Sequence, residues 1–173
     1  MRLVQCSFSE HGGAILEILN EAIVSSTALY DYRPREPDSM IEWFEAKRAG
    51  AFPVWGAVAE TEDLLGFATY GRFRAWPAYK YSVEHSVYVA RGQRGQGVGT
   101  ALMRRLIQSA VEQELHTVIG GIDAGNVDSI AFHQKLGFVH AGTVKHAGFK
   151  FERWLDLAFY QLILPTPRAP RDG

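Results

Sequence analysis

The chain has 173 residues, 47% of them hydrophobic, and a formal net charge of −1 at pH 7. This length supports one domain with a substantial core, and the near-neutral charge argues against nucleic acid or an anionic membrane as the main partner. The lone cysteine, Cys6, excludes an internal disulfide, and neither a membrane-length apolar run nor a signal-peptide pattern is present, so we expect a cytoplasmic protein.

Apolar periodicity and turn residues predict an alternating series of strands and helices. The expected order is a strand at 2–8, helices at 12–25 and 39–49, strands at 54–60, 64–71 and 81–90, a helix at 98–114, a strand at 117–122, a helix at 126–136, and strands at 138–146 and 153–164. The aromatic stretch 72–81 is expected to form a loop. We expect the proline-containing tail 165–173 to be disordered, which leaves a single domain at 1–164.

A glycine-rich turn, Arg94-Gly-Gln-Gly-Val-Gly99, joins the strand that ends near Ala90 to the following helix. Such a turn leaves backbone N–H groups unpaired at the positive end of the helix dipole, which suits a pyrophosphate. Glycines at 95, 97 and 99 let the backbone approach the phosphates without a Cβ in the way. The alternating glycines fit neither the G-x-G-x-x-G dinucleotide fingerprint nor a P-loop, which needs Gly-Lys-Ser/Thr.

The remaining pattern, R-x-x-G-x-G from Arg94 to Gly99, resembles the acetyl-CoA pyrophosphate loop of GNAT-type N-acetyltransferases. Asn126 opens a helix that runs towards Gly137-Phe138, as in the second signature of that family. The resemblance implies an α/β fold with a mixed sheet of about seven strands flanked by about four helices. The residues that would contact acetyl-CoA are then Val87, Tyr88, Val89, Arg94, Gly95, Gln96, Gly97, Val98, Gly99, Thr100, Asn126 and Ser129.

Further segments are similar to the phosphinothricin and methionine sulfoximine acetyltransferase group. They are Val83-Glu-His-Ser-Val-Tyr-Val89, Phe132-His-Gln-Lys-Leu-Gly-Phe138, Phe149-Lys-Phe-Glu-Arg-Trp-Leu-Asp156 and Tyr70-Gly-Arg-Phe-Arg74. The resemblance covers nearly the whole chain and also implies a homodimer in which Lys150 and Phe151 reach a neighbouring site. It does not identify the substrate.

Two residues are candidates for the chemistry. Glu84 lies on the strand that leads to the cofactor, where a carboxylate can take a proton from a substrate ammonium and where burial would raise its pKa. His133 stands where the family usually has a tyrosine acid, so it could protonate the departing thiolate, relay a proton or serve only in packing. His85 follows Glu84 directly, and strand alternation places it on the opposite face, where we expect a structural role.

The substrate candidates lie mainly in the aromatic loop. Arg74 can bind a substrate carboxylate with two hydrogen bonds, while Phe73 and Trp76 can wall its apolar part. Lys150 is added by the resemblance alone, and Arg72 is read as a solvated loop charge.

The resulting hypothesis is an acetyl-CoA-dependent N-acetyltransferase acting on the α-amine of a small amino-acid analogue, with a backbone N–H near Val87–Val89 holding the oxyanion. No clustered His, Cys or acidic spacing predicts a metal. The alternatives are acetylation of a protein N-terminus or polyamine, and a non-catalytic acyl-CoA-binding module.

Overall fold

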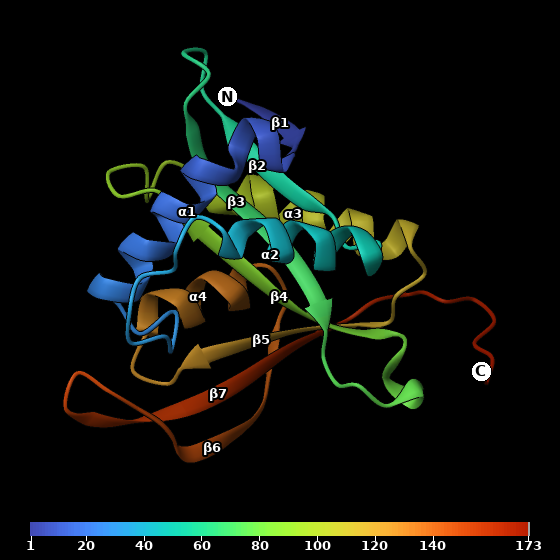
Figure 1. The fold of residues 1–173 in the computed structure, drawn as a ribbon. Helices are drawn as coiled ribbons and strands as arrows, with labels where there is room; N and C mark the ends of the chain where they lie inside the picture. The colour runs from blue at the N-terminus through green and yellow to red at the C-terminus, as the bar shows by residue number, and fades with distance from the viewer. Residues whose placement is uncertain (173) are drawn as a thin grey trace. The chain divides into compact units, whose positions relative to one another are not determined.

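The computed structural model describes residues 1–172 of the chain. The strands are β1 (Arg2–Gln5), β2 (Val54–Val58), β3 (Leu64–Arg72), β4 (Ser82–Val89), β5 (Thr117–Asp123), β6 (Val139–Lys150) and β7 (Arg153–Ile163). The helices are α1 (Phe8–Ser25), α2 (Ser39–Ala49), α3 (Val98–Glu112) and α4 (Val127–Lys135), with a short 3-10 helix, η1 (Pro77–Tyr79), inside the predicted loop (Figure 1). The predicted order of elements is confirmed.

The strands form a mixed sheet, as expected for the predicted fold class. Their order is β1-β2-β3-β4-β5-β7-β6. Strand β4 is parallel to β5, whereas β1 and β2, β2 and β3, β5 and β7, and β6 and β7 pair antiparallel. The chain forms two compact units, the first made of Met1–Gly71 and Ser86–Ser109 and the second of Arg72–His85 and the chain from Ala110 onward.

Helix α1 begins at Phe8, earlier than the predicted start at Gly12. The N-cap is Ser7, whose hydroxyl accepts a hydrogen bond from the backbone N–H of Glu10, while the Glu10 carboxylate accepts one from the same hydroxyl. This serine-to-acid spacing is a helix-start signal. It outweighs the adjacent glycines at 12 and 13, which the prediction took as the boundary.

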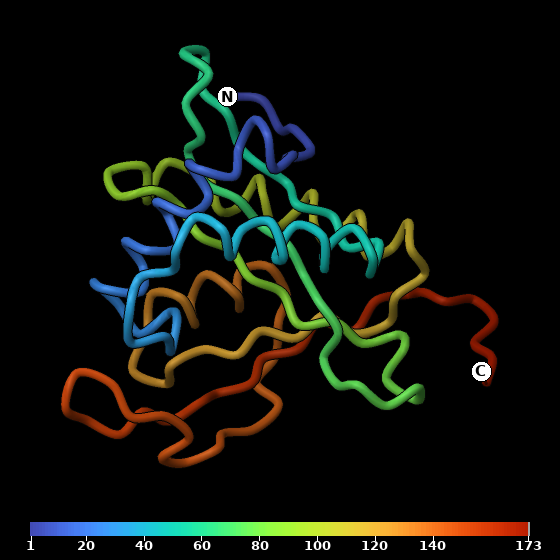
Figure 2. Tube along the Cα trace, viewed as in Figure 1, coloured from blue at the N-terminus to red at the C-terminus, as the bar shows by residue number. Residues whose placement is uncertain are grey.

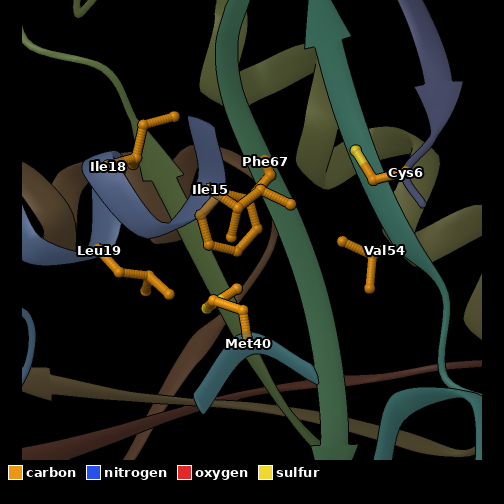
Figure 3. Close-up of a cluster of buried hydrophobic side chains, with 7 residues drawn as sticks. All are labelled: Cys6, Ile15, Ile18, Leu19, Met40, Val54 and Phe67. Atoms are coloured by element: carbon orange, nitrogen blue, oxygen red, sulfur yellow. The ribbon is translucent and has the colours of Figure 1, made fainter. Parts of the chain in front are cut away.

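The core of the first unit lies between α1, α2 and the strands of that unit. Figure 3 shows Ile15, Ile18 and Leu19 of α1 close to Phe67 of β3, which is fully buried. Met40 of α2 belongs to the same cluster. Apolar burial in such a cluster is the main source of folding free energy. Helix α2 is also joined to β3 by Lys47, whose ammonium donates a hydrogen bond to the Tyr70 carbonyl at 2.8 Å.

In the second unit, residues 157–163 of β7 pair with the whole of β5, and β7 forms a long hairpin with β6 (Figure 2). The hairpin turn is Phe151-Glu152, and both residues have positive φ, 50° and 58°. The predicted end of β6 at residue 146 was therefore too early, because the turn lacks the glycine or asparagine that usually marks such a geometry.

The segment after β7 is bonded to the second unit. The Thr166 hydroxyl donates to the Leu115 carbonyl, and the backbone of Arg171 contacts the Tyr81 hydroxyl. The single-domain and disordered-tail expectations stay predictions. Among residues 1–172, no helix has both the length and the apolar character needed to cross a membrane.

Candidate active site

The glycine turn of the first unit has the geometry that an anion site needs. Gly95 and Gly97 have φ values of 78° and 83°, which L side chains rarely adopt, and the space where a Cβ would lie is open at both. The Gly97 carbonyl accepts the first hydrogen bond of α3, from the Ala101 N–H. The N–H groups of Val98, Gly99 and Thr100 therefore belong to the first helical turn, where no intrahelical acceptor exists.

Two side chains hold this turn in shape. The Arg94 guanidinium donates to the Val89 carbonyl at 3.3 Å and to the Glu21 carboxylate of α1 at 3.0 Å. The Gln96 side-chain amide donates to the Gly92 carbonyl at 3.0 Å. Gly99 lies inside α3, within the predicted helix 98–114, and has no positive φ. Arg94 and Gln96, predicted to contact the cofactor, are thus engaged with protein groups that preform the turn.

In the second unit, Glu84 lies at the end of the ladder between β4 and β5, opposite Ile119. A Cβ built on Gly121 of β5 would be 2.9 Å from Glu84 Oε1, and Leu157 and Phe159 of β7 border the same space. Burial raises the pKa of Glu84, and the nearby positive charge of Arg74 opposes that rise. No group of residues 1–172 donates a hydrogen bond to this carboxylate. It is therefore open to a substrate proton.

The aromatic loop carries Arg74, whose positive charge acts on this carboxylate. The Arg74 guanidinium lies 4.0 Å from the centre of the Phe73 ring and donates to the Phe73 carbonyl at 2.7 Å. The Phe73 ring packs edge-on against Phe159 at 6.2 Å between ring centres. Trp76 is 68% exposed, so it is free to contact a ligand. Arg74 and Phe73 are thus grouped with Glu84, as the predicted roles require.

His133 of α4 is 3% exposed, and both of its ring nitrogens have partners inside the second unit. Its Nδ1 is 2.7 Å from the Ser129 carbonyl, which can only accept, so Nδ1 carries the proton. The neutral ring then accepts at Nε2 from Nε2–H of His85, at 3.1 Å. This assignment leaves His85 Nδ1 buried and without a hydrogen-bond partner among the described residues.

Both histidines are held neutral. Burial lowers the pKa of His85 to about 3, and the neighbouring His133 acts in the same direction. Burial also lowers the pKa of His133, although its hydrogen bond to Ser129 opposes the change. His85 contacts the position of Gly120 and Glu84 that of Gly121, so the two side chains lie on opposite faces, as alternation predicts.

The start of α4 places the other predicted cofactor residues. Asn126 is the N-cap of α4, as predicted, and its Oδ1 accepts a hydrogen bond from the Ser129 N–H at 3.1 Å. Capping occupies the oxygen and leaves the Nδ2 donors available.

At the β6–β7 turn, Lys150 is buried with its ammonium 5.0 Å from the Phe151 ring centre, whereas Phe151 is 52% exposed.

Sequence reasoning missed three residues beside Glu84: Gly121, Leu157 and Phe159. The available signal was the Gly-Gly pair within an otherwise apolar strand, since glycine inside a strand often marks close approach of another group. The described residues contain no group of three or more His, Cys, Asp or Glu side chains able to hold a metal.

The preformed glycine turn at the start of α3 defines an anion site of the kind that the pyrophosphate of a coenzyme needs. Residues 15–138 match the acetyltransferase (GNAT) family. The chain is 41% identical over 157 residues to the L-methionine sulfoximine/L-methionine sulfone acetyltransferase of Pseudomonas paraeruginosa, covering 90% of this chain and 91% of the relative.

Solved structures support the same family assignment. The N-acetyltransferase of Staphylococcus aureus Mu50 matches with a TM-score of 0.90 at 46% identity, covering 94% of this chain and 97% of that one. A phosphinothricin acetyltransferase of Sinorhizobium meliloti, in complex with acetyl-CoA, matches with a TM-score of 0.93 at 31% identity, covering 99% and 92%. The chain belongs to the GNAT family of acetyl-CoA-dependent N-acetyltransferases.

Proposed function

We propose that this enzyme acetylates the free α-amine of a small amino acid whose side chain ends in an oxygen-rich tetrahedral group, as in methionine sulfone, methionine sulfoximine or phosphinothricin. The observation that carries the proposal is that Phe159, which borders the space beside Glu84, packs against Phe73, over whose ring the Arg74 guanidinium lies. A zwitterionic substrate offers a carboxylate to Arg74 and an ammonium to Glu84. The names of the relatives support this substrate class.

Glu84 is assigned the role of general base. A carboxylate whose pKa is raised by burial is a stronger proton acceptor than a solvated one. Glu84 takes one proton from the substrate ammonium, directly or through a water molecule, and leaves an amine lone pair. Acetyl-CoA supplies the acetyl group, so the new C–N bond replaces the thioester C–S bond, and the CoA thiol and one proton are released.

Acetyl-CoA fits the groups that the chain provides. The open space at Gly95 and Gly97 and the free N–H groups at the start of α3 suit a pyrophosphate. We assign the backbone of Val87–Val89 to the pantetheine arm and the oxyanion. Asn126 Nδ2 and Ser129 are assigned to the pantetheine as well. Tyr88 lies between Val87 and Val89, and Thr100 lies in the first turn of α3, so both are assigned to the cofactor as well.

For His133 we favour a supporting role over direct proton transfer. Its Nδ1–H is directed at the Ser129 carbonyl and its Nε2 lone pair at His85. Neither nitrogen is left over for a thiolate. The buried histidine pair then serves to fix α4, whose first residues are assigned to the cofactor.

The β6–β7 hairpin supports a homodimer as the working form. Its exposed large apolar side chains are Val139, Val144, Phe149, Phe151, Trp154 and Ile163. Exposed apolar side chains concentrated on one hairpin are typical of an interaction surface. Because Lys150 is buried and Phe151 exposed, Phe151 is the better candidate to reach a neighbouring subunit.

Acetyl-CoA dependence and the absence of an internal disulfide are in keeping with action in the cytoplasm.

A thiol-release assay tests the function. We expect CoA release with methionine sulfone, methionine sulfoximine and phosphinothricin, and much less with their carboxamides, with spermidine or with an unblocked peptide. Glu84→Gln keeps the shape of the side chain and should lower kcat by about 10²–10⁴-fold at neutral pH. Faster turnover of peptide or polyamine would replace the amino-acid assignment, and absence of release with every amine would favour a binding module.

A further inference from the structure

Strand β5 contains two consecutive glycines, Gly120 and Gly121, just past the last pair of the β4–β5 ladder. Neither is among the glycines with positive φ, so the backbone conformation at these positions is open to any residue. Glycine within a strand lacks a side chain to pack and lowers stability. The reason for glycine here must therefore be space.

The two glycines provide space on opposite faces of the strand. A Cβ at Gly121 would lie 2.9 Å from Glu84 Oε1 and 3.3 Å from Leu157 Cδ1. A Cβ at Gly120 would lie 2.7 Å from His85 Nε2. Distances below about 3 Å force one of the two groups to move. The side chains of two successive β4 residues are thus accommodated by two successive β5 glycines.

The consequence differs between the faces. His85 is held by its hydrogen bond to His133 and is buried. Glu84 has no hydrogen-bond donor among residues 1–172, so only packing and the Arg74 charge determine where its carboxylate lies. Gly121 is exposed, so solvent reaches the space beside Glu84.

We propose that Gly121 is a positioning residue: the absence of its side chain leaves the place in which the Glu84 carboxylate receives the substrate proton. This inference rests on the proposed role of Glu84 as the base. A residue without any functional group then affects the rate of proton removal through Glu84, because a base displaced by about 1 Å can lose on the order of 10²-fold in rate.

The test is Gly121→Ala. The atom that the new methyl group meets is the end of a flexible side chain, so the fold should persist and the carboxylate should move. We expect kcat to fall about tenfold to a hundredfold while the KM for acetyl-CoA stays unchanged. The added methyl also removes water from the carboxylate, so the acidic limb of the kcat–pH profile should move to higher pH.

Two variants serve as controls. Gly13→Ala, on α1, introduces a methyl with nothing within 4 Å and should leave kcat and its pH profile unchanged. Gly120→Ala meets the buried histidine pair and should lower thermal stability without moving the acidic limb.

The coupling to Glu84 separates this inference from the proposed function. In a Glu84→Gln background, Gly121→Ala should cost little more, since the base is already lost. Wild-type rates in Glu84→Gln alone would overturn the base assignment. An inactive Glu84→Gln combined with an unchanged kcat and pH profile in Gly121→Ala would overturn the positioning role while the base assignment stands.

Two further outcomes are decisive. A raised KM for the amine with unchanged kcat and acidic limb would mean that Gly121 makes room for substrate, which also overturns the positioning role. If Gly121→Ala does not fold, Glu84→Asp shortens the side chain and relieves the contact. The comparison is then Glu84→Asp with and without Gly121→Ala. An upward shift of the acidic limb on adding the methyl supports the positioning role, and an unmoved limb overturns it.

Discussion

Acid should destabilise this protein through the buried histidine pair. The pKa of His85 is about 3 in the folded chain and 6.5 when exposed, so the unfolded chain binds more protons than the folded one between these values. The free energy of unfolding therefore falls as the pH falls through this window. From pH 7 to pH 5, His85 alone accounts for a loss of about 2 kcal/mol.

The neighbouring titratable groups change the total but not the sign for His85. The pKa of His133 is lowered as well, which adds to the loss. Glu84 acts in the opposite sense, because a raised pKa makes the folded chain bind more protons as the pH falls. A comparison of variants at each pH removes the Glu84 contribution, since it is common to both proteins.

The measurement is urea unfolding at pH 7 and pH 5 for wild type, His85→Gln and His140→Gln. His85→Gln keeps a donor for His133 and removes the titration, so its loss on acidification should be about 2 kcal/mol smaller. His140 is exposed, and its replacement should leave the wild-type difference unchanged. Equal losses in wild type and His85→Gln would refute the reasoning, as would a His85 ring that titrates near its ordinary pKa in the folded protein.

Three further changes test separate parts of the molecule. Gly97→Val puts a branched side chain at a φ of 83° in the glycine turn and should raise the KM for acetyl-CoA at least tenfold with the fold retained; unchanged affinity would remove the turn from the cofactor site. Arg74→Ala should raise the KM for the amino acid roughly tenfold or more but not that for its carboxamide, since a charge-assisted hydrogen bond contributes about 1.5–3 kcal/mol. Burial lowers the pKa of Lys47 from 10.5 to about 8, so between these pH values the unfolded chain binds more protons than the folded one. The free energy of unfolding of the wild type should therefore rise with pH in this window. Urea unfolding of Lys47→Met should show no such gain.

The order of elements was predictable because each local signal agreed with the fold. The periodicity of α3 and the asparagine cap of α4 are contained in short windows of sequence. Ser7 and Glu10 are also a local signal for the start of α1, but the prediction placed the boundary at the glycines that follow them. The Phe151-Glu152 turn could not be predicted, because neither residue is a usual choice for positive φ.

The site was predictable only in part, for a different reason. Glu84 and Arg74 could be predicted as site residues because each lies in a segment that resembles the acetyltransferase group. The role of Gly121 depends on its distance to Glu84, a contact between residues on different strands that no local pattern encodes. The proton positions on His85 and His133 likewise follow from which atom faces the Ser129 carbonyl, which only a structure provides.

The turn of the β6–β7 hairpin has a consequence for making a more heat-resistant enzyme. Phe151 and Glu152 both occupy a backbone region that costs roughly 1–3 kcal/mol for a residue with a side chain such as these. Asn-Gly at these two positions would relieve that cost and raise the melting temperature. The same exchange would remove the exposed Phe151 ring at the hairpin tip. Heat resistance gained at this turn would therefore weaken the contact proposed between Phe151 and a neighbouring subunit.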